Sequence, residues 1–114
     1  MQKVYNIIGL AQRAGKVSSG VMAAKSSIIR RKACLLVMSN DIAANNKETL
    51  VSLCEKKGIP FVFLGNKYEL GNCVGKAYRV AITINDRKMA EKILQVAKGM
   101  GDEANSMGVF EWPK

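Results

Sequence analysis

The sequence predicts an α/β protein with a three-layer α/β/α sandwich and a central mixed sheet of about four strands. Segments with apolar residues at helical spacing alternate along the chain with short, continuous apolar runs. The runs at residues 34–38 and 61–64 suit strands that are buried on both faces, so helices must cover the sheet on both sides. With 114 residues, the chain has room for one domain with its own core.

The chain is expected to begin with a helix over about residues 3–14, where Val4, Ile7, Ile8 and Ala11 recur at helical spacing. Arg13 and Gly15 are the cation and the glycine that are typical of a helix end. A short extended segment at Lys16 and Val17 follows. Ser18 or Ser19 is then expected to be the N-cap of a second helix, whose inward residues are Val21, Ala24, Ile28 and Ile29.

Strands and helices continue to alternate in the second part of the chain. The run at 34–38 is expected to be a central strand, and Asn45-x-x-Glu48 resembles a capping box for a helix over about 44–57 that ends at Gly58. A strand at 61–64 precedes a second capping-box pattern, Asn66-x-x-Glu69, which opens a short helix through Val74. The run at 80–84 predicts a fourth strand, and Asp86 is expected to cap a last helix that buries Met89, Ile93, Val96 and Ala97.

We expect a single domain over residues 1–99. Residues 100–114 have two glycines, directly after Gly99, and little periodicity, which predicts a mobile or loosely docked tail.

Charge is distributed unevenly along the chain, whose formal net charge is +9. The first forty residues contain seven basic residues and no acid, since the first carboxylate is Asp41. Such asymmetry favours a polyanionic partner, either a nucleic acid or an anionic membrane surface.

The composition of the chain argues against several other classes of protein. No apolar stretch approaches the roughly 20 residues of a membrane-spanning helix, and the N-terminus lacks a signal-peptide pattern, so a cytoplasmic protein without membrane partners is expected. The chain has no histidine, and its three cysteines, Cys34, Cys54 and Cys73, fit no metal-binding spacing. We therefore expect no catalysis, no metal and no cofactor.

Two polar and basic segments are candidates for function. Gly15 and Lys16 lead through Ser19 and Gly20 into a helix N-terminus, which suits an oxyanion such as phosphate, although a glycine stop followed by a serine cap explains the same residues. In the segment 75–80, Lys76 and Arg79 flank Tyr78, a combination that suits a stacked base with its phosphates. A loop tyrosine packed on the core between solvated charges is the alternative.

The chain resembles the kink-turn-binding ribosomal-protein family of the L7Ae and L30e type, and within it the small bacterial YlxQ-like members. The segments that carry the resemblance are GLAQRAGKVSSG, RRKACLLVMSNDIA and GIPFVFLGNKYELGNCVGKAYRVAI, and it covers about residues 3–99. The last segment, with its LGxxxELGxxxGKxxRV pattern, is the most specific. This resemblance agrees with the predicted sandwich.

The resemblance implies binding of RNA at a kink-turn, where tandem G·A pairs bend the helix sharply. In the family, the helix that begins at Gly20 enters the RNA groove, and the loop that matches Lys76, Tyr78, Arg79 and Val80 packs on an extruded nucleotide. Family members typically carry Asn-Glu or similar polar residues after the glycine, whereas this chain has Met22 and Ala23. Lys25 lies one place short of the usual lysine.

The hypothesis from the sequence is therefore a non-catalytic RNA-binding protein, associated with the ribosome, that recognises kink-turn-like RNA. Structured RNA, ribosomal RNA above all, is the expected partner, together with ribosomal or other RNA-associated proteins. The alternative is a protein-interaction module that docks an acidic partner through the basic N-terminal face.

Overall fold

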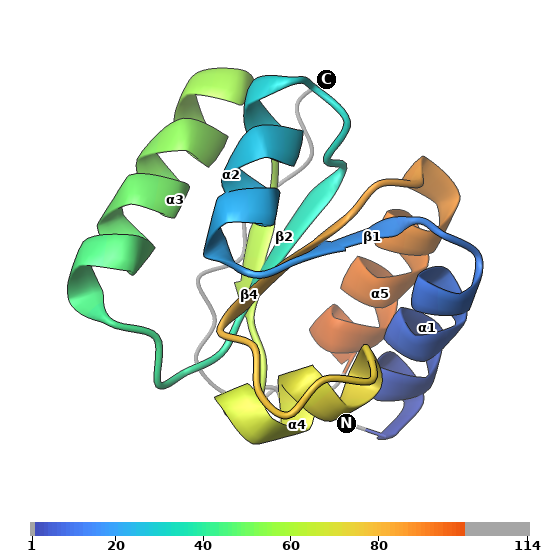
Figure 1. Cartoon of the computed structure of the whole chain (residues 1–114). Helices are drawn as coiled ribbons and strands as arrows, with labels where there is room; N and C mark the ends of the chain where they lie inside the picture. The colour runs from blue at the N-terminus through green and yellow to red at the C-terminus, as the bar shows by residue number, and fades with distance from the viewer. Residues whose placement is uncertain (1, 100–114) are drawn as a thin grey trace.

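The computed structural model describes residues 2–99, in which helices and strands alternate from α1 to α5 (Figure 1). In chain order the elements are α1 (Gln2–Arg13), β1 (Val17–Ser19), α2 (Val21–Ile29), β2 (Leu35–Met38), α3 (Ala44–Lys57), β3 (Phe61–Phe63), α4 (Lys67–Cys73), β4 (Ala81–Ile84) and α5 (Arg87–Gly99). The predicted alternation is confirmed. The expected tail at 100–114 lies outside the described residues.

The four strands form one mixed sheet in the order β1-β4-β2-β3. β2 and β3 are parallel, while β4 runs antiparallel to both β1 and β2. β1, β2 and β3 therefore finish at the same end of the sheet, where β4 begins. We call this the carboxyl end, and we call the opposite end, where β1, β2 and β3 begin, the amino end.

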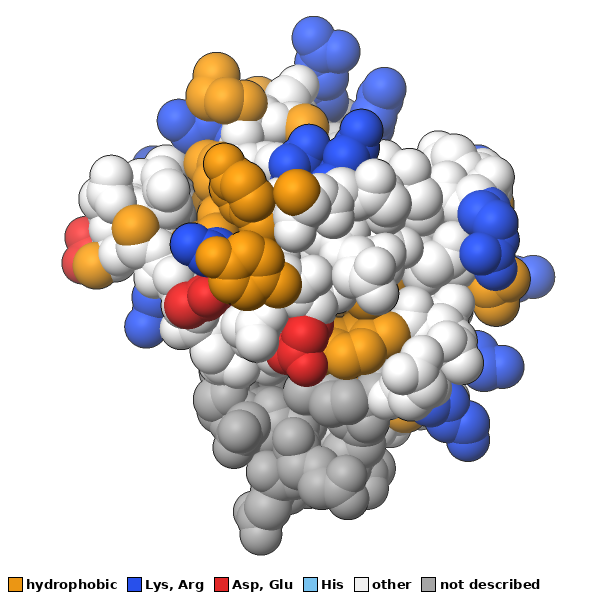
Figure 2. Space-filling view, turned by 60° about the horizontal axis from the view of Figure 1, so that its bottom comes forward, with side chains coloured by type: hydrophobic (Ala, Val, Ile, Leu, Met, Phe, Trp, Pro, Cys, Tyr) orange, Lys and Arg blue, Asp and Glu red, His pale blue; other side chains and the backbone are white. Residues whose placement is uncertain are grey.

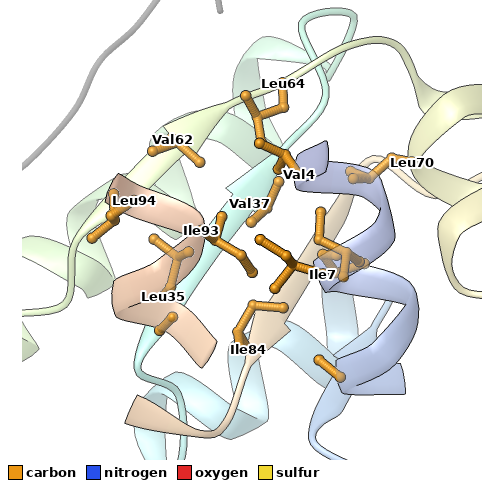
Figure 3. Packing of buried hydrophobic residues seen from close by; sticks show 14 of the residues in the cluster. Val4, Ile7, Leu35, Val37, Val62, Leu64, Leu70, Ile84, Ile93 and Leu94 are labelled. Carbon is orange, nitrogen blue, oxygen red and sulfur yellow. The ribbon is translucent and has the colours of Figure 1, made fainter. Parts of the chain in front are cut away.

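Helices cover both faces of the sheet, so the predicted three-layer sandwich is confirmed (Figure 1). Side chains alternate along β2: Leu35 and Val37 join the core with α1, α4 and α5 (Figure 3), whereas Leu36 and Met38 join the core with α2 and α3. All four residues of β2 are buried, as expected of a central strand.

Several predicted caps follow the sequence closely. The Asn66 side chain accepts from the backbone N–H groups of Tyr68 and Glu69, and the Glu69 carboxylate accepts from the Asn66 N–H, so the capping box of α4 is confirmed. Asp86 accepts from the Lys88 N–H at the start of α5. Gly58, the C-cap of α3, has the left-handed conformation that favours glycine.

Two predicted N-caps are wrong. Gly20 is the N-cap of α2, because Ser18 and Ser19 belong to β1 and the Ser18 hydroxyl is hydrogen-bonded to the Ser27 hydroxyl, 2.6 Å away. Ala43 is the N-cap of α3, so Asn45 lies inside the first turn and makes no capping bond.

Two predictions of inward residues also need correction. Ile29, at the end of α2, is 50% exposed rather than buried. In α5, Ala90 and Leu94 are buried with Ile93 and Ala97, while Met89 and Val96 are only partly buried at the margin of the core.

None of the helices within residues 2–99 has the length and apolar character that spanning a membrane requires.

Candidate RNA-binding surface

Hydrogen bonds join the loops at the carboxyl end of the sheet into one surface. The Gly20 N–H donates to the Ala81 carbonyl over 2.8 Å, and the Ser39 N–H donates to the Val80 carbonyl over 2.9 Å. Asn40 donates through its backbone N–H and its side-chain amide to the Gly65 carbonyl. The start of α2, the loop before β4 and the loops after β2 and β3 therefore lie next to one another.

The N-terminus of α2 presents unpaired backbone donors to this surface. Its N-cap, Gly20, has φ 102° and no side chain, and in the described part of the chain no side chain caps the first N–H groups of the helix. Met22 and Ala23 occupy the first turn, and the Met22 side chain is 78% exposed. The helix start therefore combines N–H donors, at the positive end of the helix dipole, with an exposed apolar side chain.

Arg79 lies against the start of α2. A Cβ placed on Gly20 would be 3.8 Å from the Arg79 Nε, an ordinary contact distance, so this side chain packs beside the N-cap of α2. Arg79 Nη1 donates to the Tyr78 carbonyl over 2.8 Å, but the buried Nε has no hydrogen-bond partner among residues 2–99. A buried donor without an acceptor costs about 1–3 kcal/mol, a cost that would be recovered if the side chain shifted to meet an incoming oxygen atom.

Tyr78 is exposed next to Lys67, the first residue of α4. The Lys67 Nζ lies 5.7 Å from the centre of the Tyr78 ring and 5.4 Å from that of Tyr68, at cation–π distance from both. Both tyrosine side chains are more than half exposed. They offer ring faces for stacking beside a cation.

Lys67 and Tyr68 belong to this candidate surface, but the sequence analysis missed them. The signal that could have found them is the capping box at Asn66, which starts α4 directly after the predicted strand at 61–64, together with the predicted helix at 44–57, since strands joined by a helix are usually parallel. Parallel strands finish at the same end of a sheet, so the start of α4 had to lie near the loop after β2.

Gly71 fixes the position of the loop that carries Tyr78. A Cβ on Gly71 would lie 2.5 Å from the Tyr78 Cα and 2.8 Å from both the backbone C and N atoms. The Arg79 N–H also donates to the Lys67 carbonyl over 2.9 Å. The loop therefore packs directly on the backbone of α4, which places its side chains at the carboxyl end of the sheet.

The acidic residues of this surface are engaged by α4. Asp41 accepts from the Lys67 N–H over 3.0 Å, and Glu69 belongs to the capping box. On the face shown in Figure 2, hydrophobic side chains lie beside basic and acidic ones. The carboxyl end is thus a mixed surface of exposed apolar groups, cations and backbone donors.

The structure separates Gly15 and Lys16 from the other predicted site residues. Both precede β1, and the Lys16 carbonyl accepts from the Asn85 N–H beyond the far end of β4. Ser19, Gly20, Met22, Ala23 and Lys25 lie at or within two turns of the start of α2, and Lys76, Tyr78, Arg79 and Val80 lie in the neighbouring loop. Gly15 and Lys16 are instead at the amino end of the sheet.

Burial keeps the thiols and one phenol protonated. It raises the pKa of Cys54 to about 12 and that of Cys73 to about 11. Burial, together with the nearby Glu69 carboxylate, raises the pKa of Tyr5 to about 12. Each of these groups is therefore neutral at pH 7. Within residues 2–99 no group of three or more cysteine, aspartate or glutamate side chains could hold a metal ion.

The chain matches the model of the ribosomal protein L7Ae/L30e/S12e/Gadd45 family over residues 2–94. The protein belongs to this family. The resemblance found in the sequence is thereby confirmed.

Curated members of the L7Ae/L30e family with similar sequences come from bacteria and archaea. The RNA-binding protein YlxQ of Enterococcus faecium is 31% identical over 98 residues, which cover 86% of this chain and 94% of that protein. YlxQ of Bacillus subtilis is 27% identical over 92 residues, covering 81% and 92%. The large ribosomal subunit protein eL8 of Thermoplasma volcanium is 34% identical over 95 residues, covering 81% and 77%.

Solved structures agree with the fold. A protein of unknown function from Bacillus halodurans superposes with a TM-score of 0.80 at 28% identity, covering 82% of this chain and 95% of that one. The 15.5kD RNA-binding protein of Giardia lamblia has a TM-score of 0.73 at 22% identity, covering 87% and 88%, and shows the shared fold.

Proposed function

We propose that this protein is a non-catalytic RNA-binding protein, associated with the ribosome, that holds kink-turn-like RNA at the carboxyl end of its sheet. Family membership supports RNA binding, since relatives bear the names RNA-binding protein YlxQ and large ribosomal subunit protein eL8. Ribosomes are cytoplasmic, so the proposal includes a cytoplasmic location.

The observation that carries the proposal is the unpartnered Arg79 Nε beside the uncapped start of α2. A phosphate or base oxygen at this position would accept from the guanidinium and from the helix N–H groups together. Hydrogen bonds from a charged donor are roughly twice as strong as neutral ones. With a small outward shift of the Arg79 side chain, an RNA oxygen would therefore satisfy donors that residues 2–99 leave unpaired.

The neighbouring side chains would contact different parts of the RNA. The exposed Tyr78 ring offers a face on which an extruded base can stack, and Lys67 and Lys76 supply charge for its phosphates. Met22 and Ala23 have no side-chain donor or acceptor, so they would contribute apolar contact and leave polar recognition to the α2 backbone and Arg79.

A titration of the purified protein with a kink-turn RNA, and with a straight RNA duplex of equal length, tests the proposal. The kink-turn RNA should bind more tightly at every salt concentration, because only a bent RNA with an extruded nucleotide can occupy Tyr78 and the α2 start together. Affinity for both should fall with salt, with a log–log slope of about 0.9 for each phosphate neutralised.

Equal affinity for the two RNAs across the salt range would contradict kink-turn recognition. Binding of neither RNA at low salt would contradict RNA binding altogether and would favour the protein-interaction module.

A further inference from the structure

Most of the basic residues in the first third of the chain lie away from the carboxyl end. Lys25 is close to the start of α2, but α1 ends at Arg13, Lys16 precedes β1, and Arg30, Arg31 and Lys32 follow α2. These segments are all at the amino end of the sheet. There the backbone of Cys34 bonds to that of Ile84, and the backbone of Asn85 bonds to that of Lys16.

Other elements add cations at the same end. α3 finishes with Lys56 and Lys57, and α5 begins with Arg87 and Lys88. Within the described range 2–99 the acids on these segments are Glu55, Asp86 and Glu91, so the described basic residues at the amino end of the sheet outnumber the described acidic ones.

Three of the cations line one pocket. It has a volume of about 220 Å³ and is lined by Arg31, Lys57 and Arg87, with Cys34 and Pro60 among the other lining residues. Among residues 2–99 no carboxylate lines it. Arg87 Nε bonds to Glu91 over 3.1 Å, whereas Arg31 and Lys57 make no ion pair with any residue in the described range 2–99.

Helix dipoles explain only part of this charge. Lysines at the end of α3 favour the negative end of its dipole, but Arg87 and Lys88 lie in the first turn of α5, where the positive dipole end disfavours cations. Asp86 offsets part of that cost. The ion pair between Arg87 and Glu91, one turn further along α5, offsets another part, and some of the charge at the start of α5 is left for an anionic ligand to neutralise.

The backbone conformation of Arg31 also favours an anionic ligand at this end of the sheet. The Arg31 N–H bonds to the Ile28 carbonyl and the Lys32 N–H to the Ser27 carbonyl, so α2 ends in a Schellman motif with Arg31 at the position that usually holds glycine. Its φ is +61°, a conformation that costs energy for any residue with a Cβ. Among residues 2–99 it is the one non-glycine residue with positive φ, and it lines the pocket.

We propose that the amino end of the sheet is a second RNA surface, centred on the Arg31, Lys57 and Arg87 pocket, which binds the phosphodiester backbone of an RNA duplex without regard to its sequence. The inference rests on the proposed function, since it assumes that RNA is the polyanion. Four residues of β2 separate the two ends of the sheet, a span of about 13 Å. One molecule could thus hold two segments of folded RNA.

The test measures binding of a straight RNA duplex to the full-length wild type, to three double variants and to the Arg31→Gly single variant over a range of salt. The pocket variant is Arg31→Gly with Lys57→Gln. The matched control, Lys3→Gln with Lys92→Gln, removes the same charge from α1 and α5. The third variant, Lys67→Gln with Lys76→Gln, changes the carboxyl end.

The pocket variant should bind the duplex about tenfold more weakly near 0.1 M salt, with the slope reduced by about 2, because two phosphate contacts are lost. The control variant should change duplex affinity less than twofold, and the carboxyl-end variant should weaken chiefly the binding of the kink-turn RNA.

Glycine at position 31 removes the backbone strain, so the melting temperature of the Arg31→Gly single variant should rise while its duplex affinity falls. Unfolding then cannot explain the loss.

Equal effects of the pocket and control variants would overturn the proposal of a second surface, because net charge alone would then explain binding.

Alkylation of Cys34 gives a second measurement, made at alkaline pH because burial raises the pKa of this thiol. Duplex RNA should slow it several-fold, and an unchanged rate would also overturn the proposal. Tighter binding of kink-turn RNA than of duplex would still support the proposed function in either case.

Discussion

Replacing Gly71 with alanine should destabilise the protein by about 2 kcal/mol and weaken kink-turn RNA binding at least tenfold. Alanine favours a helix over glycine by about 1 kcal/mol, which alone would stabilise α4. The new Cβ, however, would lie 2.5 Å from the Tyr78 Cα, and overpacking typically costs 1–3 kcal/mol or more. The clash should prevail, because it is with backbone atoms that no rotamer change can move.

Gly9→Ala is the matched control in α1. Its Cβ would meet the Cys73 carbonyl oxygen at 3.6 Å, an ordinary contact, so the helix preference should leave stability unchanged or raise it. Urea unfolding of both variants gives the comparison, and RNA titration gives the second readout. A Gly71→Ala protein with the stability and RNA affinity of the wild type would show that the loop does not depend on this packing.

Replacing Tyr78 with alanine should weaken kink-turn RNA binding by about 1–3 kcal/mol, the usual scale of a stack between an aromatic ring and a base. The ring is 56% exposed and packs little on the core, so the melting temperature should stay close to that of the wild type. Tyr78→Phe keeps the ring face and should bind nearly as well as the wild type. The measurement is a fluorescence titration of all three proteins with the same RNA.

Unchanged affinity of Tyr78→Ala, at unchanged stability, would show that the ring makes no contact with RNA. Equal losses in Tyr78→Phe and Tyr78→Ala would assign the effect to the hydroxyl group rather than to stacking.

The elements that were predicted correctly depend on local chemistry. The Asn66-x-x-Glu69 box acts within one turn, and the continuous apolar run of β2 is sufficient to predict a central strand. The N-cap of α2 was not predictable in this way. The Ser18 hydroxyl bonds to Ser27 and accepts from Asn85, which is 67 positions away, and tertiary contacts of this kind prevail over local capping preference.

The residues of the candidate site are likewise brought together by tertiary structure, which local sequence patterns do not predict. Gly15 and Lys16 are close to Gly20 in sequence, but the intervening strand is extended, so Lys16 and Gly20 are about 13 Å apart. Lys67 is distant from Gly20 in sequence, yet sheet topology brings α4 to the same end as α2. Charge counted along the chain predicted a polyanion partner, but only the fold shows that this charge lies at two opposite ends of the sheet.

The central claim is that kink-turn RNA lies on the carboxyl end of the sheet. It is tested most directly by following the backbone amide chemical shifts of this 12.4 kDa protein by NMR during a titration with the RNA. The largest changes should fall in the first turn of α2, in the loop at 75–80 and around Lys67. Changes confined to the outer faces of α1 and α5, with those three segments unmoved, would contradict the account.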